Sequence, residues 1–176
     1  MAPDGYHLIR TDSPVGELTL VASDAGLRNV LWTNGRPGRV VPPPGPVVAR
    51  PHPVLEDARA QLAQYFAYER QTFDVPLDLA GTESQRAAWL ALADIPYGET
   101  VSYGEQARRR GRPGAARAIG AANGRNPVSI ILPCHRVVGI GGALTGYAAG
   151  LDVKIALLEH ERAALQGTVD RARLHT

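Results

Sequence analysis

The chain has 176 residues, of which 44% are hydrophobic and 20% charged, and its net charge is +2. These values exclude a disordered chain and are typical of a globular protein of one domain or two small ones. Its apolar runs are too short for a membrane span, and charged residues interrupt the first twenty positions. We therefore expect a cytoplasmic protein (nucleoid-associated in a bacterium) with no membrane partner.

The first part of the chain predicts a small α/β domain over residues 1–79. Residues 6–10, 17–22 and 27–32 are apolar stretches separated by turn-forming residues, which predicts three short strands in an antiparallel meander. Residues 34–53 are half Pro and Gly, so we expect a loop or linker there. Apolar residues recur at helical spacing over 54–70, which predicts a helix that covers the sheet. We predict only a supporting role for this domain.

A mostly helical second domain is expected over residues 80–167. Thr82 and Gln85 have capping-box spacing, which predicts a helix that ends before the turn at residues 96–98. Ser102 and Glu105 repeat this spacing and introduce a short helix that Gly111 should end. The fold class is therefore α/β, with a small N-terminal sheet and helix domain before a mostly helical C-terminal domain.

The next helix should begin at Pro113 and run to residue 123. A short helix, a tight turn and a second helix have the spacing of a helix-turn-helix, which is a DNA-binding motif. Small residues fill the second helix and leave Arg117 as almost its only long side chain. Small residues allow close approach either to another helix or to a DNA groove, and composition does not separate these two interpretations.

Positive charge is concentrated in residues 101–136. This segment contains seven arginines and one acidic residue, Glu105. Its net charge is therefore +6, and the rest of the chain carries −4. A charge run of this kind is common on solvated faces, but it also suits an anion-binding surface that contacts phosphates. The arginines are Arg108, Arg109, Arg110, Arg112, Arg117, Arg125 and Arg136.

The apolar run 128–132 predicts a strand, and the only cysteine of the chain, Cys134, follows it. A buried free cysteine is usually a small hydrophobe, but the neighbouring imidazole and guanidinium of His135 and Arg136 favour a reactive thiolate. Adjacent residues of a regular strand point to opposite faces. We therefore expect Pro133 to bend the chain and to bring Cys134 and His135 to one pocket.

The remaining segments are a glycine-rich loop at 139–150, a helix over 152–165 capped by Asp152, and a tail at 168–176. The loop matches neither the P-loop nor the dinucleotide-binding pattern. One cysteine excludes an internal disulfide, and the five histidines lack metal-ligand spacing. The sequence therefore predicts neither a metal nor a cofactor.

The segment "GAARAIGAANGRNPVSIILPCHRVVGIGGALTGYAAGLDVKIALLEHE" strongly resembles the O6-alkylguanine-DNA alkyltransferases, also called methylated-DNA-protein-cysteine methyltransferases. The resemblance covers residues 82–161 and rests on "PCHRV", with "RNP" upstream and "GY" downstream. It implies a DNA repair protein that flips O6-alkylguanine out of duplex DNA and transfers the alkyl group irreversibly to its own cysteine. O4-alkylthymine is a further expected substrate. A monomer is expected, and clustering along DNA stays open.

The resemblance assigns roles in the reaction to four residues. Cys134 would accept the alkyl group, and His135 would act as general base through a water molecule. Glu161 would polarise His135, and Tyr147 would donate the proton that the leaving guanine needs. An irreversible thioether would make this a stoichiometric, suicidal enzyme.

Further residues are assigned to DNA and to the substrate pocket by the same resemblance. Arg117 would enter the duplex in place of the extruded base, and Tyr103 would crowd the phosphate of the target nucleotide. Asn126 would join the recognition helix to the active-site segment. The full DNA-binding set is Arg117, Tyr103, Ala116, Ala118, Gly120 and Asn126, and the pocket set is Asn126, Val137, Tyr147 and Ala148.

Three alternative functions stay open. The alkyltransferase-like proteins bind alkylated DNA without repairing it, but they lack the acceptor cysteine that this chain has. A helix-turn-helix transcription regulator would use Arg117 to read base edges, and Cys134 would then be structural. A cysteine hydrolase would use Cys134 and His135 as its dyad and would turn over an ester or amide.

Overall fold

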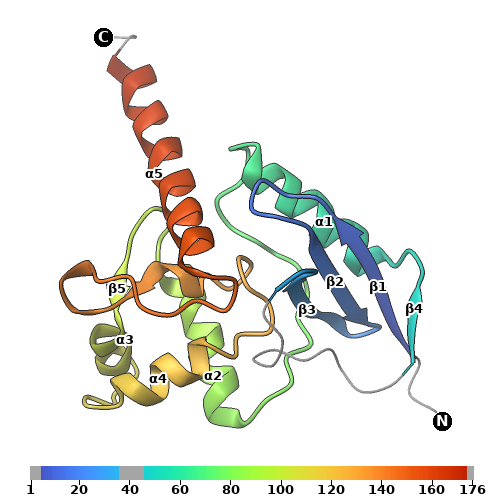
Figure 1. The fold of residues 1–176 in the computed structure, drawn as a ribbon, viewed down its shortest axis with the longest axis horizontal. Helices are drawn as coiled ribbons and strands as arrows, with labels where there is room; N and C mark the ends of the chain where they lie inside the picture. Colours follow the sequence, from blue (N-terminus) through green and yellow to red (C-terminus); the bar gives the residue numbers. More distant parts are fainter. Residues whose placement is uncertain (1–4, 36–45, 174–176) are drawn as a thin grey trace.

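The structure is a computed structural model that describes residues 5–35 and 46–173, with side chains up to residue 167. One sheet contains β1 (Tyr6–Thr11), β2 (Leu18–Ser23), β3 (Gly26–Trp32) and β4 (Val47–Ala49) in the order β3-β2-β1-β4. The strands β1 to β3 form the antiparallel meander that the sequence predicts. Figure 1 shows α1 (Pro53–Phe66) packed across this sheet.

Two predictions in this half need correction. The expected loop at 34–53 contains β4, a strand that pairs in parallel with β1 at the sheet edge, where flanking prolines are tolerated; residues 36–45 lie outside the described part. The helix predicted over 54–70 ends at Phe66, because the backbone turns to a left-handed conformation at Tyr68, with φ 62°.

The second half contains α2 (Glu83–Ala91), α3 (Tyr103–Arg109), α4 (Ala116–Asn123) and the long α5 (Leu151–Arg173), which extends away from the other helices (Figure 1). Three 3₁₀ turns, η1 (Leu92–Asp94), η2 (Cys134–Arg136) and η3 (Ile140–Gly142), and the paired strands β5 (Val101–Ser102) and β6 (Val137–Val138) connect them. The Thr82–Gln85 capping box and the Ser102 cap are present. The predicted fold class is thus confirmed.

Helix boundaries differ from the prediction at two places. Helix α4 begins at Ala116 instead of Pro113, because Gly114 adopts φ 90° in the preceding turn. Helix α5 begins one residue before Asp152, which therefore lies in the first turn and is not the cap, and it continues through most of the predicted tail to Arg173.

The strand predicted at residues 128–132 is absent. Val128 and Ser129 make only isolated bridges, and Ile130 has φ 73°, a left-handed conformation that is costly for a β-branched residue. Ile130 is 1% exposed, so core packing holds this turn in place. The apolar run is therefore a buried turn that leads into the cysteine.

The two halves share one core. Buried residues of the sheet, such as Leu20 and Leu27, belong to the same cluster as Trp89 and Leu157 of the C-terminal helices. A backbone hydrogen bond from Val30 N–H to the Pro127 carbonyl, 2.8 Å, attaches β3 to the segment before the cysteine. The sheet is thus packed directly against the part of the chain that carries Cys134.

The fold brings His7, Asp24 and His52 together, although their sequence spacing does not suggest it. The N–H of Val54 donates to Nδ1 of His52, so neutral His52 carries its proton on Nε2, which lies 3.2 Å from the Asp24 carboxylate. A metal at Nε2 would need that nitrogen unprotonated. We interpret this group as a hydrogen-bonded N-cap of α1.

None of the helices in the described ranges combines the length and the apolar character needed to cross a bilayer.

Candidate active site and nucleic-acid interface

A cavity of about 730 Å³ opens between α3, α4 and the loop at 139–148, and Cys134 lies in its wall. The cysteine is only 6% exposed, so a reactant must enter the cavity to reach it. Other predicted site residues that line the same cavity are Tyr103, Ala116, Arg117, Gly120, Tyr147 and Ala148. These residues come from three separate parts of the C-terminal half.

The remaining predicted site residues lie elsewhere. His135, Glu161, Asn126 and Val137 are buried and do not line the cavity. Ala118 lies in a second hollow between α2 and α4, away from Cys134. Its predicted DNA contact therefore does not belong to the Cys134 cavity.

A short 3₁₀ turn presents the cysteine. Pro133 has φ −83° and ψ 67°, and η2 starts directly after it, which is the bend that the sequence predicts at this proline. The Asn126 side chain fixes the segment that precedes the cysteine. Its Nδ2 donates to the Leu132 carbonyl at 2.8 Å, and its Oδ1 accepts from Val128 N–H at 3.1 Å. Asn126 is 2% exposed and therefore positions the cysteine turn from within.

We expected Cys134 and His135 to share one pocket, but the structure places them apart. Cys134 contributes to the cavity wall, whereas the His135 side chain is fully buried behind it and bonds to Glu161. Burial raises the pKa of the Cys134 thiol, although Asn126, Ser129 and the charge of Lys154 oppose this effect. The thiol is thus protonated near neutral pH and needs a base to become a nucleophile.

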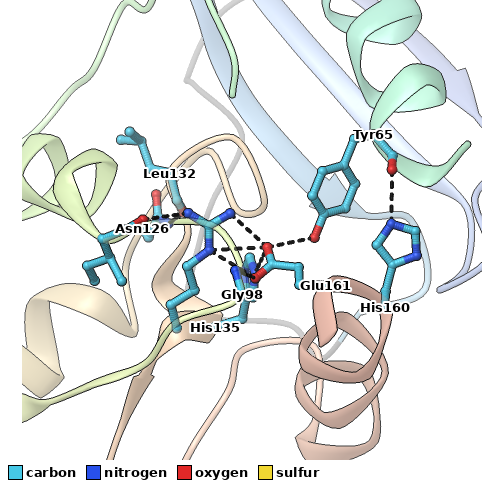
Figure 2. Close-up of polar contacts among 9 residues, drawn as sticks. Tyr65, Gly98, Asn126, Leu132, His135, His160 and Glu161 are labelled. Atoms are coloured by element: carbon cyan, nitrogen blue, oxygen red, sulfur yellow. Dashed lines mark hydrogen bonds and ion pairs between the residues drawn. The ribbon is translucent and has the colours of Figure 1, made fainter. Parts of the chain in front are cut away.

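Glu161 is the hydrogen-bond acceptor at the centre of the buried cluster in Figure 2. Its Oε1 lies 2.9 Å from Nε2 of His135 and accepts from the Tyr65 hydroxyl at 3.0 Å, while Oε2 accepts from Gly98 N–H at 3.2 Å. Because Nε2 of His135 donates its proton in a hydrogen bond to Glu161, the lone pair of the neutral imidazole is on Nδ1. This nitrogen is buried and without a partner among the described residues. Burial is the main cause that lowers the pKa of His135.

Arg136 pairs with the same carboxylate. Its Nε and Nη2 donate to Glu161 at 2.7–3.1 Å, and its Nη1 donates to the Ile95 carbonyl at 2.7 Å. Burial works to raise the pKa of Glu161, but the hydrogen bonds from His135 and Arg136 outweigh it and lower this pKa to about 2. Glu161 is therefore a carboxylate at any physiological pH.

The predicted surface patch of seven arginines needs correction, because Arg136 is 5% exposed and belongs to the core. Arg108 and Arg109 both pair with Glu105 on α3. Arg108 and Arg117 line the Cys134 cavity, whereas Arg112 and Arg125 line the second hollow. Positive charge is thus distributed around the helix-turn-helix rather than gathered at the cysteine.

Lys154 is a buried cation that the sequence interpretation missed. Its ammonium donates to the Val137 carbonyl at 2.7 Å and to the Thr145 carbonyl at 3.3 Å, and it lies 5.8 Å from the Tyr103 ring centre. It therefore ties β6 to the loop beside the cavity, and its charge favours the Cys134 thiolate. Its position in the sequence could have indicated this burial. Lys154 lies two helical turns before Glu161 and is at helical spacing from Leu157 and Leu158, which are on the buried face.

Two tyrosines border the cavity. The hydroxyl of Tyr147 is buried beside Ser129 and Cys134, and burial raises its pKa well above the usual value. Tyr147 therefore stays protonated and is available as a donor. Tyr103 donates to the Thr145 carbonyl at 3.2 Å, and a side chain at Gly120 would contact its ring at 3.7 Å. This distance is an ordinary van der Waals contact, so a methyl group at position 120 would fit beside the Tyr103 ring.

Small residues serve two different faces of α4. On its packed face, Asn123 donates to Gln106 at 2.9 Å, and Trp89 of α2 donates to the Ala122 carbonyl at 2.7 Å. On the open face, Ala116 and Gly120 line the cavity with Arg117, which is exposed and makes no ion pair with another described residue. Close approach to a neighbouring helix is thus confirmed on the packed face, whereas contact of the open face with DNA stays a prediction.

The fold and the site together define a helix-turn-helix protein whose single cysteine lies in the wall of a cavity beside its second helix. Two family models match the chain: "6-O-methylguanine DNA methyltransferase, ribonuclease-like domain" over residues 6–79, and "6-O-methylguanine DNA methyltransferase, DNA binding domain" over residues 83–163. The chain belongs to the 6-O-methylguanine DNA methyltransferase family. Its activity is methyl transfer from methylated DNA to a protein cysteine in DNA repair, and DNA is its partner.

Individual relatives agree with this assignment. The methylated-DNA--protein-cysteine methyltransferase of Mycobacterium bovis is 49% identical over 160 residues, which are 89% of this chain and 92% of that protein. The corresponding protein of Methanosarcina acetivorans is 47% identical over 150 residues, or 85% and 94%. A crystal structure of Mycobacterium tuberculosis OGT in complex with DNA superimposes with a TM-score of 0.80 at 47% identity, covering 92% of this chain and 94% of that one.

Proposed function

We propose that this chain rotates O6-alkylguanine out of duplex DNA into the cavity and transfers the alkyl group once to Sγ of Cys134. The observation that carries this proposal is the position of the only cysteine, in the wall of a cavity that also borders α4. The O6 atom lies inside the base pair, so a buried thiol reaches it only after the nucleotide leaves the stack. The alkyl oxygen of O4-alkylthymine is hidden in the same way, and we include it as a second substrate.

We propose that the thiol proton passes through a water molecule to Nδ1 of His135, the unpartnered nitrogen. Glu161 then carries the charge opposite the imidazolium, while Arg136 keeps the carboxylate ionised. The thiolate attacks the alkyl carbon, the S–C bond forms as the C–O bond breaks, and the electron pair stays on guanine. Guanine gains a proton from the buried Tyr147 hydroxyl, and the proton held by the His135 imidazolium is returned to restore the phenol, so that both residues end neutral.

The proposed reaction is limited to one turnover by its product. A thioether has no electrophilic carbonyl for water to attack, and the chain has no second cysteine that would displace the group. Each molecule therefore accepts one alkyl group and is consumed. We further propose that the protein acts as a monomer.

The proposal is tested by intact mass spectrometry after mixing the protein with a duplex that contains one O6-methylguanine. We expect a gain of one methyl group that stops at one equivalent, and no gain with the same duplex carrying plain guanine. Tight lesion binding without a gain would instead support a non-catalytic sensor. Sequence-specific binding without lesion dependence would support a regulator.

Arg117 is expected to matter for duplex DNA more than for single strands. It is exposed beside the cavity, where it fills the gap that the flipped nucleotide leaves. Since opening a base pair costs a few kcal/mol, Arg117→Ala should slow methyl transfer from a duplex by about 10- to 100-fold, with a smaller effect on a single strand. The control is Arg112→Ala, at the second hollow. Equal losses on both substrates would contradict this role.

A further inference from the structure

The N-terminal half of the chain reaches the buried carboxylate through one hydroxyl group. Tyr65 belongs to α1 and lies 96 positions before Glu161, yet its hydroxyl donates to Oε1 of that residue at 3.0 Å (Figure 2). The other donors to Glu161 in the described ranges are Gly98, His135 and Arg136, all from the C-terminal half. Tyr65 therefore links α1 of the N-terminal half to the carboxylate that also accepts from His135.

The Tyr65 side chain is held on every side. It is fully buried, and its ring packs against Phe66 and Phe73, with ring centres 5.0 and 5.5 Å away. His160 donates from Nε2 to the Tyr65 carbonyl at 2.9 Å, so two successive residues of α5 bind both ends of this tyrosine. The hydroxyl thus cannot leave the carboxylate without disturbing α1 or α5.

Packing alone does not require a hydroxyl here. A phenylalanine would fill the same volume, and burying a phenol costs free energy unless the hydroxyl is hydrogen-bonded. The hydroxyl bonds to Oε1, the same oxygen that accepts from Nε2 of His135. Any shift of this oxygen therefore moves the partner that fixes the imidazole.

We propose that Tyr65 is a positioning residue for alkyl transfer. Its hydroxyl holds Oε1 of Glu161 where this oxygen accepts from His135, and the hydrogen bond partly neutralises the negative charge of the oxygen. The inference rests on the proposed function, because the basicity of His135 matters only if Cys134 must lose a proton. When Glu161 loses the hydrogen bond from Tyr65, its carboxylate carries more negative charge toward His135. The preference of the carboxylate for the imidazolium form over the neutral form then increases. The sheet domain thereby helps to set the proton affinity of His135, beyond supporting the fold.

The inference predicts a change in how the rate of alkyl transfer depends on pH, because Tyr65 bonds to the carboxylate that pairs with His135. Loss of the Tyr65 hydroxyl should raise the pKa of His135, by about 0.5 to 1 unit if the change equals one neutral hydrogen bond. Transfer needs neutral His135, so the rate on the acid side of the pH profile should fall about three- to tenfold. The other charged or titratable groups that face His135 or Glu161 are unchanged: Tyr97, Arg136 and Lys154.

The experiment compares Tyr65→Phe with Tyr97→Phe. Tyr97 lies in the same aromatic cluster, 6.0 Å from the Tyr65 ring, but its buried hydroxyl has no partner in the described part of the chain. Single-turnover methyl transfer from the lesion duplex is measured against pH, and the ¹⁵N resonances of His135 are titrated in the free protein. Thermal melting records any general loss of stability.

We expect the acid limb and the His135 titration to move to higher pH in Tyr65→Phe and to stay in place in Tyr97→Phe. An unchanged limb and titration in Tyr65→Phe, even with a lower Tm, would overturn the inference and leave a merely structural role. Equal shifts in both variants would also overturn it. The proposed function fails separately, if wild-type protein gains no methyl group from the lesion duplex.

Discussion

Cys134→Ser is expected to abolish methyl gain completely, while the fold and lesion binding remain. A serine hydroxyl ionises only far above neutral pH, so the general base that produces a thiolate does not produce an alkoxide at a useful level. The replacement is nearly isosteric, and Asn126 and Ser129 beside the cysteine sulfur can also hydrogen-bond to a hydroxyl. The chain has no other thiol that could accept the group in its place.

The measurement is the intact mass after incubation with the O6-methylguanine duplex, together with fluorescence anisotropy for binding of the same duplex. Binding within about threefold of wild type, which is a change below 1 kcal/mol, would show that the cavity and the helix-turn-helix are intact. Methyl gain by the serine protein would mean that another residue accepts the group. That result would remove Cys134 from the proposed reaction.

Glu161→Gln is expected to cause the largest loss of stability among single substitutions of the site. The carboxylate is fully buried and paired with Arg136, so its neutral replacement leaves a buried guanidinium without a counter-charge. Breaking a buried ion pair from one side costs about 3 to 5 kcal/mol. An amide nitrogen would also face the N–H groups of Arg136 or His135, which only donate toward this position.

Acid sensitivity should change in the same variant. The pKa of Glu161 in the folded protein, about 2, is below its ordinary value of 4.5, so its stabilising effect is present above 4.5 and is lost as the pH falls toward 2. Burial also lowers the pKa of His135 from 6.5, so this residue favours the folded state above 6.5 and less so in acid. Wild-type stability should therefore fall steadily below neutral pH, and Glu161→Gln should lose the part of this dependence between pH 4.5 and 2.

Urea unfolding at several pH values checks both expectations. The matched control is Glu159→Gln, an exposed glutamate on the same helix, which should change the free energy of unfolding by less than about 0.5 kcal/mol. A Glu161 variant with wild-type stability would contradict the buried ion pair. A wild-type acid profile in that variant would show that other carboxylates control acid unfolding.

Local patterns predicted the regular elements well. The meander strands, α1, the capped α2 and the start of α3 depend on side-chain periodicity and on caps within three or four residues, and both can be read from neighbouring positions. The failures fall where distant segments meet. The β-branched run at 128–132 resembles a strand, but the core holds Ile130 in a left-handed turn.

The candidate site shows the same division. The residue types in "PCHR" and the resemblance around them identified Cys134 as the acceptor candidate, and they also suggested His135 and Glu161. No pattern placed Cys134 on the cavity and His135 behind it, because a 3₁₀ turn separates their directions. Lys154 and Tyr65 were missed for a related reason: a lysine or tyrosine in an amphipathic helix does not show which buried group it meets.

The sequence by itself therefore determined the class of fold, the helix-turn-helix, the single thiol and the family to which the chain belongs. These depend on residue identity and short-range spacing, which the linear chain contains in full. Only the tertiary structure decided that Arg136 is a buried partner of Glu161 and that Tyr65 of the sheet domain bonds to the same carboxylate. Both facts concern charged or polar groups removed from water, and such burial exists only once distant segments have packed together.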